Sequence, residues 1–266
     1  MSIGHRISVD DRLAHTKRRH RFSSDRDGVS ADDFPSAIDS EEKSMSTDTQ
    51  KPTLYYFDLR GKGEVIRLLL EAAEIPYDEV TITHATWDDN KHKFNEQGLL
   101  PFGQIPSLTV GDQVYAQSQA ILRYLGRRYD LTSTTEPDHY RIDALCSIIA
   151  DWRNAYDALI YRSSDYQQDK SVYLKSNGLG HITVVDKFLK ANGDGGSTWF
   201  LKDKFTFADV LIWDLVDSHL LLDAQFLESY PVTRGHYERL RNMRGVNKYL
   251  ESGRRSEKIN GNDNGR

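Results

Sequence analysis

The chain has 266 residues, of which 28% are charged and 38% are hydrophobic, and its formal net charge at pH 7 is −5. This composition indicates a soluble globular protein with room for one large domain or two small ones. No apolar run approaches the roughly 18 residues that a membrane-spanning helix needs, so we expect no membrane partner. The net negative charge gives no electrostatic reason to expect a nucleic-acid partner.

Residues 1–51 are predicted to be a disordered extension. They are rich in Asp, Ser, Arg and His and poor in large apolar residues, so they cannot bury enough surface to offset the entropy of ordering. The basic run Lys17–Arg21 is interpreted as a solvated charged segment, with a nuclear-import or surface-binding patch as the alternative. Translation from Met1 or from Met45 would yield the same folded unit, and we expect the extension to be dispensable for catalysis.

Residues 52–130 are predicted to form a thioredoxin-like domain with the element order β-α-β-α-β-β-α. Apolar residues recur at helical spacing in two stretches, and two short β-rich runs flank the turn Gly111-Asp112, which is typical of a hairpin. The elements expected in chain order are Thr53–Phe57, Val65–Ala73, Tyr77–Ile82, Asp88–Gln97, Ser107–Val110, Val114–Ala116 and Ile121–Leu125.

Residues 137–252 are predicted to form an all-helical bundle, which follows a linker that ends in the helix-starting Pro137. The run Gly193–Gly196 is expected to break the helical pattern. Residues 253–266 are predicted to be a disordered tail. The expected fold class is therefore α/β plus all-α, with an N-terminal thioredoxin-like domain and a C-terminal helical domain.

The most apolar predicted helix, Val210–Leu222, is preceded by a capping-box pattern. Thr206 would cap the backbone N–H of Asp209, and the Asp209 carboxylate would reach back to the start of the helix. We expect this motif to serve folding and not chemistry.

The single cysteine, Cys146, excludes an intramolecular disulfide and a cysteine-based metal cluster. No apolar core of a secretory signal peptide follows Met1. Both observations favour a reducing compartment, so we predict a cytoplasmic protein. Cys146 lies among apolar residues of a helical pattern, which predicts a small buried side chain.

Three segments of the first domain carry groups suited to chemistry. Tyr56 ends a strand with its hydroxyl at the turn, whereas Tyr55 should face the other side because strand side chains alternate. The Ile105-Pro106 pair offers an open backbone edge. Gln117-Ser118 begins a helix, where Ser118 is a natural N-cap and the backbone N–H groups favour an anion. This set suits a small anionic peptide that carries a thiol.

The pattern resembles the N-terminal domain of the cytosolic glutathione S-transferases, most closely their tyrosine-type, sigma-like branch, and the resemblance extends over residues 52–252. It implies that Tyr56 is the catalytic residue. It also implies a cis Ile105-Pro106 bond, which exposes backbone groups that pair with glutathione like an added strand. The residues that the resemblance assigns to glutathione binding are Trp87, Lys91, Gln104, Ile105, Pro106, Gln117, Ser118 and Asp151.

The resemblance also distributes these residues along glutathione. Lys91 would pair with the glycyl carboxylate, and Trp87 would donate its indole N–H to the same end. The γ-glutamyl end would bind at Gln117-Ser118. Asp151 would contact the γ-glutamyl ammonium across a dimer interface, so a homodimer is expected.

The activity implied is glutathione transfer to small hydrophobic electrophiles, a detoxification reaction in which glutathione is co-substrate and no metal or other cofactor takes part. About 3% of a cysteine-type thiol with a pKa near 8.5 is thiolate at pH 7. Lowering that pKa by about two units makes roughly three quarters of it reactive and requires about 2.7 kcal/mol of preferential thiolate stabilisation. A tyrosine O–H aimed at the sulfur can supply part of this.

Two alternatives remain open from the sequence. One is a glutathione-dependent isomerase or peroxidase that uses the same site, and the other is a non-catalytic structural or ligand-binding member of the fold. Lys62 stands where many sigma-like members carry a second arginine, and by the resemblance the long helix after Asp151 also lacks the tryptophan that prostaglandin-isomerising members use near the electrophile. Both departures argue against prostaglandin isomerisation. The electrophile pocket is expected to involve Leu59, Tyr156, Ile160 and the C-terminal segment.

Overall fold

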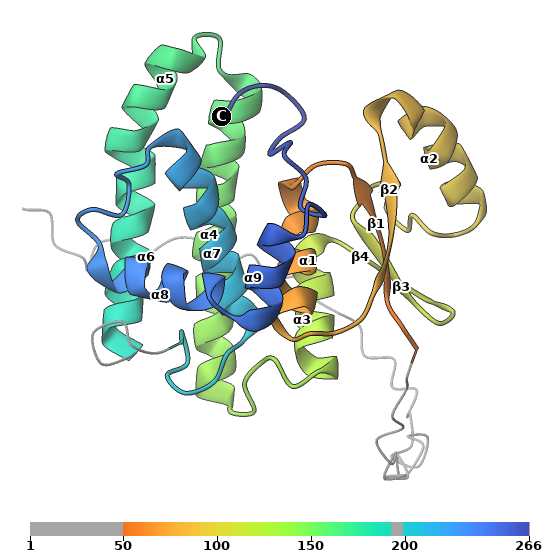
Figure 1. Cartoon of the computed structure of the whole chain (residues 1–266), viewed down its shortest axis with the longest axis horizontal. Coiled ribbons are helices and arrows are strands. Elements are labelled where there is room, and N and C mark those ends of the chain that lie inside the picture. The colour runs from red at the N-terminus through yellow and green to blue at the C-terminus, as the bar shows by residue number, and fades with distance from the viewer. Residues whose placement is uncertain (1–49, 193–198, 266) are drawn as a thin grey trace, which may run out of the picture. The chain divides into compact units, whose positions relative to one another are not determined.

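The computed structural model describes residues 50–192 and 199–265, in which a four-stranded sheet with its helices is followed by a helical region (Figure 1). The predicted extension lies outside the described residues apart from Gln50 and Lys51. The predicted break at Gly193–Gly196 also lies outside them.

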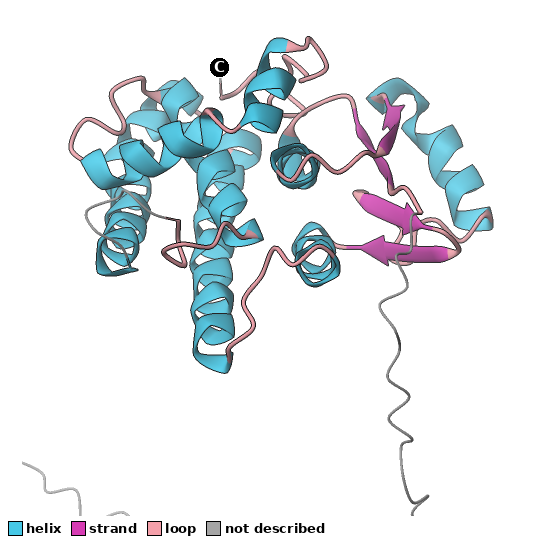
Figure 2. Ribbon diagram, turned by 60° about the horizontal axis from the view of Figure 1, so that its bottom comes forward, coloured by secondary structure: helices cyan, strands magenta, loops and turns pink. Residues whose placement is uncertain are grey.

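The sheet has the strand order β2-β1-β3-β4, with β1 parallel to β2 and antiparallel to β3. Figure 2 shows α2 on the opposite side of the sheet from α1 and α3. The predicted order β-α-β-α-β-β-α is confirmed. The elements are β1 (Thr53–Phe57), α1 (Glu64–Ala72), β2 (Asp78–Ile82), α2 (Trp87–Glu96), β3 (Ser107–Val110), β4 (Gln113–Ala116) and α3 (Ser118–Arg128).

The alternation expected in β1 is present. Leu54 and Tyr56 are buried on the side that packs against α1 and α3, and the ring of Tyr55 on the other side lies 5.5 Å from that of Phe94 in α2. Tyr55 and Tyr56 therefore occupy opposite faces of the sheet, as the strand period requires.

The helical region begins with α4, which Thr135 caps by accepting the backbone N–H of Asp138. Its helices pack around a core that includes Trp152 and Trp213, and α7 contacts α1, α4 and α8. None of the helices in the described ranges combines the length and apolar character needed to cross a bilayer. The helices are α4 (Glu136–Arg162), α5 (Tyr166–Tyr173), α6 (Leu179–Asn192), α7 (Phe207–Leu222), α8 (Pro231–Arg241) and α9 (Arg244–Glu251).

The predicted capping box is confirmed at the start of α7. The fully buried Asp209 carboxylate accepts the backbone N–H and the hydroxyl of Thr206 at 2.8 and 3.1 Å. It also accepts the backbone N–H of Phe200 at 2.7 Å and pairs with the His236 ring at 2.8 Å. One carboxylate thus joins the start of α7, the preceding loop and α8.

The C-terminal segment, residues 253–265, does not match the expected disordered tail. It follows α9 and crosses the end of α4, where the amides of Asn262 and Asn264 both donate to the carbonyl of Ile160 at 2.8 Å. Asn260 donates to the Tyr156 hydroxyl at 3.0 Å. Because hydrogen bonds and ion pairs order this segment, it has no apolar periodicity from which its order could be predicted.

Cys146 is 1% exposed in α4, and burial raises the pKa of its thiol to about 11. The predicted small buried side chain is therefore confirmed.

Candidate functional site

A cavity of about 370 Å³ opens where the end of β1, the loop before β3 and the start of α3 meet. All of the predicted glutathione-binding residues except Asp151 line it, together with three that the sequence analysis did not assign: Phe57, Lys62 and Gly103. The lining residues are Phe57, Lys62, Trp87, Lys91, Gly103, Gln104, Ile105, Pro106, Gln117 and Ser118.

The loop before β3 carries a cis Ile105-Pro106 peptide bond, as expected from the sequence. The side chain of Gln117 donates to the Gln104 side chain at 3.4 Å, which links this loop to the start of α3. Lys91 lies 5.8 Å from the ring of Trp87, so a cation and an indole N–H stand together at the α2 side of the cavity.

The start of α3 differs by one residue from the prediction. Gln117 occupies the N-cap position with no side-chain capping bond, and Ser118 is the first helical residue. Gln117 has φ +68°, a conformation that costs free energy at a non-glycine residue and is frequent at ligand sites. Because the Gln117 side chain does not cap α3, the first N–H groups of the helix and the Ser118 hydroxyl are available to an anion in the cavity.

Tyr56 is 6% exposed and is not among the residues that line the cavity, but it contacts two that are: its ring lies 5.8 Å from that of Phe57, and its hydroxyl bonds to Lys62. Its hydroxyl oxygen accepts the backbone N–H of Lys62 at 2.8 Å. Burial raises the pKa of Tyr56 to about 12, so the hydroxyl keeps its proton at neutral pH. A neutral phenol can donate that proton in a hydrogen bond to a sulfur without ionising itself.

The β1–α1 loop, residues 58–63, approaches Tyr56 closely through its two glycines. A Cβ at Gly63 would lie 2.3 Å from Cδ1 of Tyr56, and one at Gly61 would lie 2.6 Å from the hydroxyl. Gly61 also has φ +41°, which favours glycine. Gly61 and Gly63 therefore make room for the tyrosine.

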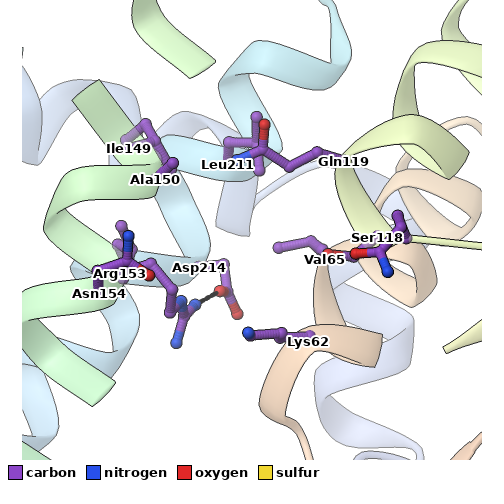
Figure 3. A pocket seen from close by; sticks show the side chains of 12 residues that line it. Lys62, Val65, Ser118, Gln119, Ile149, Ala150, Arg153, Asn154, Leu211 and Asp214 are labelled. Atoms are coloured by element: carbon purple, nitrogen blue, oxygen red, sulfur yellow. Dashed lines mark hydrogen bonds and ion pairs between the residues drawn. The ribbon is translucent and has the colours of Figure 1, made fainter. Parts of the chain in front are cut away.

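A second cavity of about 300 Å³ adjoins the first and shares Lys62, Gln117 and Ser118 with it. In Figure 3 Lys62, Ser118, Arg153 and Asp214 face this space from different helical segments. Arg153 forms a buried ion pair with Asp214. Burial raises the pKa of the Asp214 carboxyl to about 6 although Arg153 opposes the shift.

Asp151 is exposed on α4 and lines neither cavity, although its neighbours Ala150 and Arg153 line the second. Within one chain the structure therefore does not bring Asp151 together with the other predicted residues. Lys62 was noticed in the sequence only as a departure from the family pattern. Arg153 and Asp214 are 61 positions apart, and no sequence signal links them.

Two residues expected to face the electrophile are placed elsewhere. Tyr156 and Ile160 are fully buried beneath the C-terminal segment. Tyr161 is 51% exposed, and its hydroxyl accepts the N–H of Gly261 at 3.1 Å. His84 stacks on Phe57, which lines the first cavity, with ring centroids 4.5 Å apart.

Comparisons with known proteins agree with this geometry. Residues 52–127 match the family model "Glutathione S-transferase, N-terminal domain", and residues 150–253 match "Glutathione S-transferase, C-terminal domain". The chain is 34% identical to Glutathione S-transferase Mu 6 of Mus musculus over 76% of this chain and 91% of that protein. It is 32% identical to Glutathione S-transferase 2 of Onchocerca volvulus over 80% and 98%. The solved structure of an Onchocerca volvulus Pi-class glutathione S-transferase superposes with a TM-score of 0.72 at 31% identity, covering 81% of this chain and 99% of that one.

Proposed function

The chain belongs to the glutathione S-transferase family and is a glutathione transferase, and from that premise we propose that Tyr56 activates the glutathione thiol in the cavity beside it. The observation that supports this assignment most strongly is that seven of the predicted glutathione-binding residues line one cavity of about 370 Å³, together with Phe57 and Lys62, which Tyr56 contacts. The tyrosine-type assignment is part of this proposal. A sigma-like class is part of the same proposal and rests on the motifs around Tyr56, Pro106 and Ser118; the relatives described above carry Mu and Pi names or no class name.

In the proposed reaction the Tyr56 hydroxyl donates a hydrogen bond to the sulfur and stabilises the thiolate over the thiol. The thiol proton passes to solvent, and the thiolate attacks a small hydrophobic electrophile and forms a carbon–sulfur bond. The attack displaces a leaving group, opens a strained ring, or breaks the π bond of an enone, whose carbon then takes up a proton. Because the pKa of Tyr56 is raised to about 12, the phenol stays protonated while the thiol ionises. The Lys62 N–H polarises the phenol oxygen, which strengthens the phenol as a donor.

Glutathione is proposed to lie across the cavity with one anionic end at each side. The uncapped N-terminus of α3 and Ser118 would hold the γ-glutamyl end, with Lys62 supplying a cation. Lys91 and Trp87 would hold the glycyl carboxylate, and the Ile105 backbone would pair with the cysteinyl residue between them.

Incubating the purified protein with glutathione and a panel of aryl halides, epoxides, enones and hydroperoxides tests this function. Conjugates identified by mass for at least one carbon electrophile would support transferase chemistry. Turnover of hydroperoxides alone would favour the peroxidase alternative. A folded protein that is inactive with every compound would support the non-catalytic alternative.

Ser118→Ala is expected to raise the KM for glutathione about 10- to 150-fold with a smaller change in kcat, because it removes an anchor at a non-reacting end of the substrate. Calorimetric titration of the variant with glutathione measures the loss directly. Ser147→Ala is the matched control, since Ser147 lies exposed on α4 and bonds only within its helix. If Ser118→Ala binds glutathione with wild-type affinity, the γ-glutamyl end does not bind at Ser118.

We also propose a two-fold homodimer and a cytoplasmic location. Phe102 is 65% exposed beside the cis-proline loop, and Asp151 is exposed outside both cavities, so both are available to a second chain. The single cysteine is consistent with a reducing compartment. Light scattering at micromolar concentration should give twice the mass of one chain, and a monomer mass would rule the dimer out.

A further inference from the structure

The C-terminal segment is joined by hydrogen bonds to the β1–α1 loop that carries the partner of Tyr56. The backbone N–H groups of Arg60 and Gly61 donate to the carbonyls of Lys258 and Ile259 at 2.8 and 3.1 Å. The side chain of Arg60 donates through Nε to the carbonyl of Ser256 at 2.9 Å. Two stretches almost 200 residues apart in the chain therefore form one unit beside the catalytic tyrosine.

Arg255 anchors this unit to the helices below it. Its Nε donates to Glu64 at 2.7 Å, and its Nη2 donates to Asp217 at 2.6 Å. The Arg255 side chain is 12% exposed, and its guanidinium lies 5.3 Å from the centre of the Trp213 ring. Glu64 begins α1 and Asp217 belongs to α7, so one arginine ties the C-terminal segment to both domains.

Glu64 and Asp217, the two carboxylates that pair with Arg255, also contact other residues of the network. Asp217 also lies 3.6 Å from Nη1 of Arg60, which brings the network back to the β1–α1 loop. Glu64 is fully buried and accepts hydrogen bonds from Arg67 at 3.3 Å and from the Tyr249 hydroxyl at 3.2 Å. Because Glu64 is fully buried and the side chains of Arg255 and Asp217 are only 12% and 14% exposed, the arrangement has little freedom to adjust around a missing member.

We propose that Arg255 is a positioning residue for Tyr56, because it holds the C-terminal segment against the β1–α1 loop and so fixes the Lys62 N–H that donates to the Tyr56 hydroxyl. This inference rests on the proposed role of Tyr56. Without Arg255, the carbonyls of Lys258 and Ile259 no longer hold Arg60 and Gly61. Lys62 follows Gly61 directly, so its N–H loses its fixed direction.

The direction of that N–H matters for the phenol. While its oxygen accepts the Lys62 N–H, the Tyr56 O–H is polarised and constrained to point away from Lys62, which strengthens and orients its bond to the sulfur. The charged and titratable groups that act directly on Tyr56 are Arg67, Arg153 and Tyr161. Arg255 acts through the geometry of the loop.

The test compares Arg255→Gln, Arg255→Lys and Arg254→Gln by the pH profile of kcat/KM for conjugation. Arg254 is the matched control, because it pairs with Glu71 at the surface and is 56% exposed. Arg255→Gln is expected to raise the pH midpoint by about one unit, which lowers the thiolate fraction and kcat at pH 7 about threefold, with the KM for glutathione nearly unchanged. Arg255→Lys should give a pH midpoint and kcat between those of Arg255→Gln and the wild type, because a lysine ammonium lacks the forked guanidinium that reaches both carboxylates. Arg254→Gln should behave as wild type.

The inference is overturned if folded Arg255 variants keep the wild-type pH midpoint and kcat, or if Arg254→Gln shifts the midpoint equally. A loss of activity that only tracks the folded fraction, at an unchanged midpoint, would also refute it. If Arg255→Gln does not fold, Arg255→Lys decides the matter. Tyr56→Phe is measured in parallel: wild-type activity in it overturns both proposals, whereas an impaired Tyr56→Phe beside normal Arg255 variants overturns only this one.

Discussion

Tyr56→Phe is expected to lower kcat at pH 7 about 10-fold or more, with the affinity for glutathione nearly unchanged. The hydroxyl interacts with thiolate more strongly than with thiol, so its removal costs reactivity and little ground-state binding. Full loss of a shift of about two pKa units would reduce the thiolate fraction about 25-fold at pH 7. The phenol supplies part of that shift, and the higher intrinsic reactivity of a more basic thiolate offsets some of the loss.

The pH profile distinguishes this role from a packing role. In the wild type kcat/KM should rise through the lowered pKa of the bound thiol, and in Tyr56→Phe the midpoint should move toward the free-thiol value of about 8.5. The difference in kcat/KM between the wild type and Tyr56→Phe should therefore become smaller as pH rises. Because burial raises the pKa of Tyr56 to about 12, its own ionisation adds no step over this range.

Tyr55→Phe is the matched control for Tyr56→Phe. Tyr55 is the preceding residue of β1, and its ring packs on Phe94 on the opposite face of the sheet. It should retain wild-type kcat and pH midpoint. Equal kcat in Tyr56→Phe and wild type from pH 6 to 8, with chemistry rate-limiting, would remove Tyr56 from the mechanism.

The first domain could be predicted from the sequence because its signals are local. Alternation over Thr53–Phe57 and the glycines after it fix which tyrosine faces the core, and contiguous motifs around Pro106 and Ser118 mark the cavity wall. The one-residue error at the start of α3 has a local cause as well. Gln117 adopts φ +68°, and a positive φ is uncommon at residues other than glycine, so nothing in the sequence predicts it.

The parts of the site that could not be predicted depend on contacts between distant residues. Arg153 and Asp214 meet only because α4 and α7 pack side by side. The C-terminal segment is ordered by backbone carbonyls and asparagine amides, groups whose partners no periodic pattern reveals. Hydrophobic periodicity predicts what a segment buries, so a segment held by polar groups at the edge of a site is misread as a tail.

Asp209→Ala is expected to lower the free energy of unfolding by roughly 3–5 kcal/mol, the range for breaking a buried ionic or hydrogen-bonded cluster. The carboxylate is fully buried and accepts the N–H groups of Thr206 and Phe200 in addition to its contact with His236. Alanine leaves these donors without an acceptor in a site that water does not reach, and each unsatisfied group costs about 1–3 kcal/mol.

Urea unfolding at one fixed protein concentration measures the loss, with Asp165→Ala as the matched control. Asp165 caps α5 from an exposed position by accepting the N–H of Gln168 at 3.2 Å, so its loss should cost only about 1 kcal/mol. If Asp209→Ala lowers the free energy of unfolding no more than Asp165→Ala does, the buried cluster is dispensable for stability.

Since α7 also carries Asp214 and Asp217, the folded fraction of Asp209→Ala at low temperature should keep the wild-type pH midpoint of kcat/KM. A shifted midpoint there would mean that the capping box also sets the geometry of the catalytic loop, through Asp217 and Arg255.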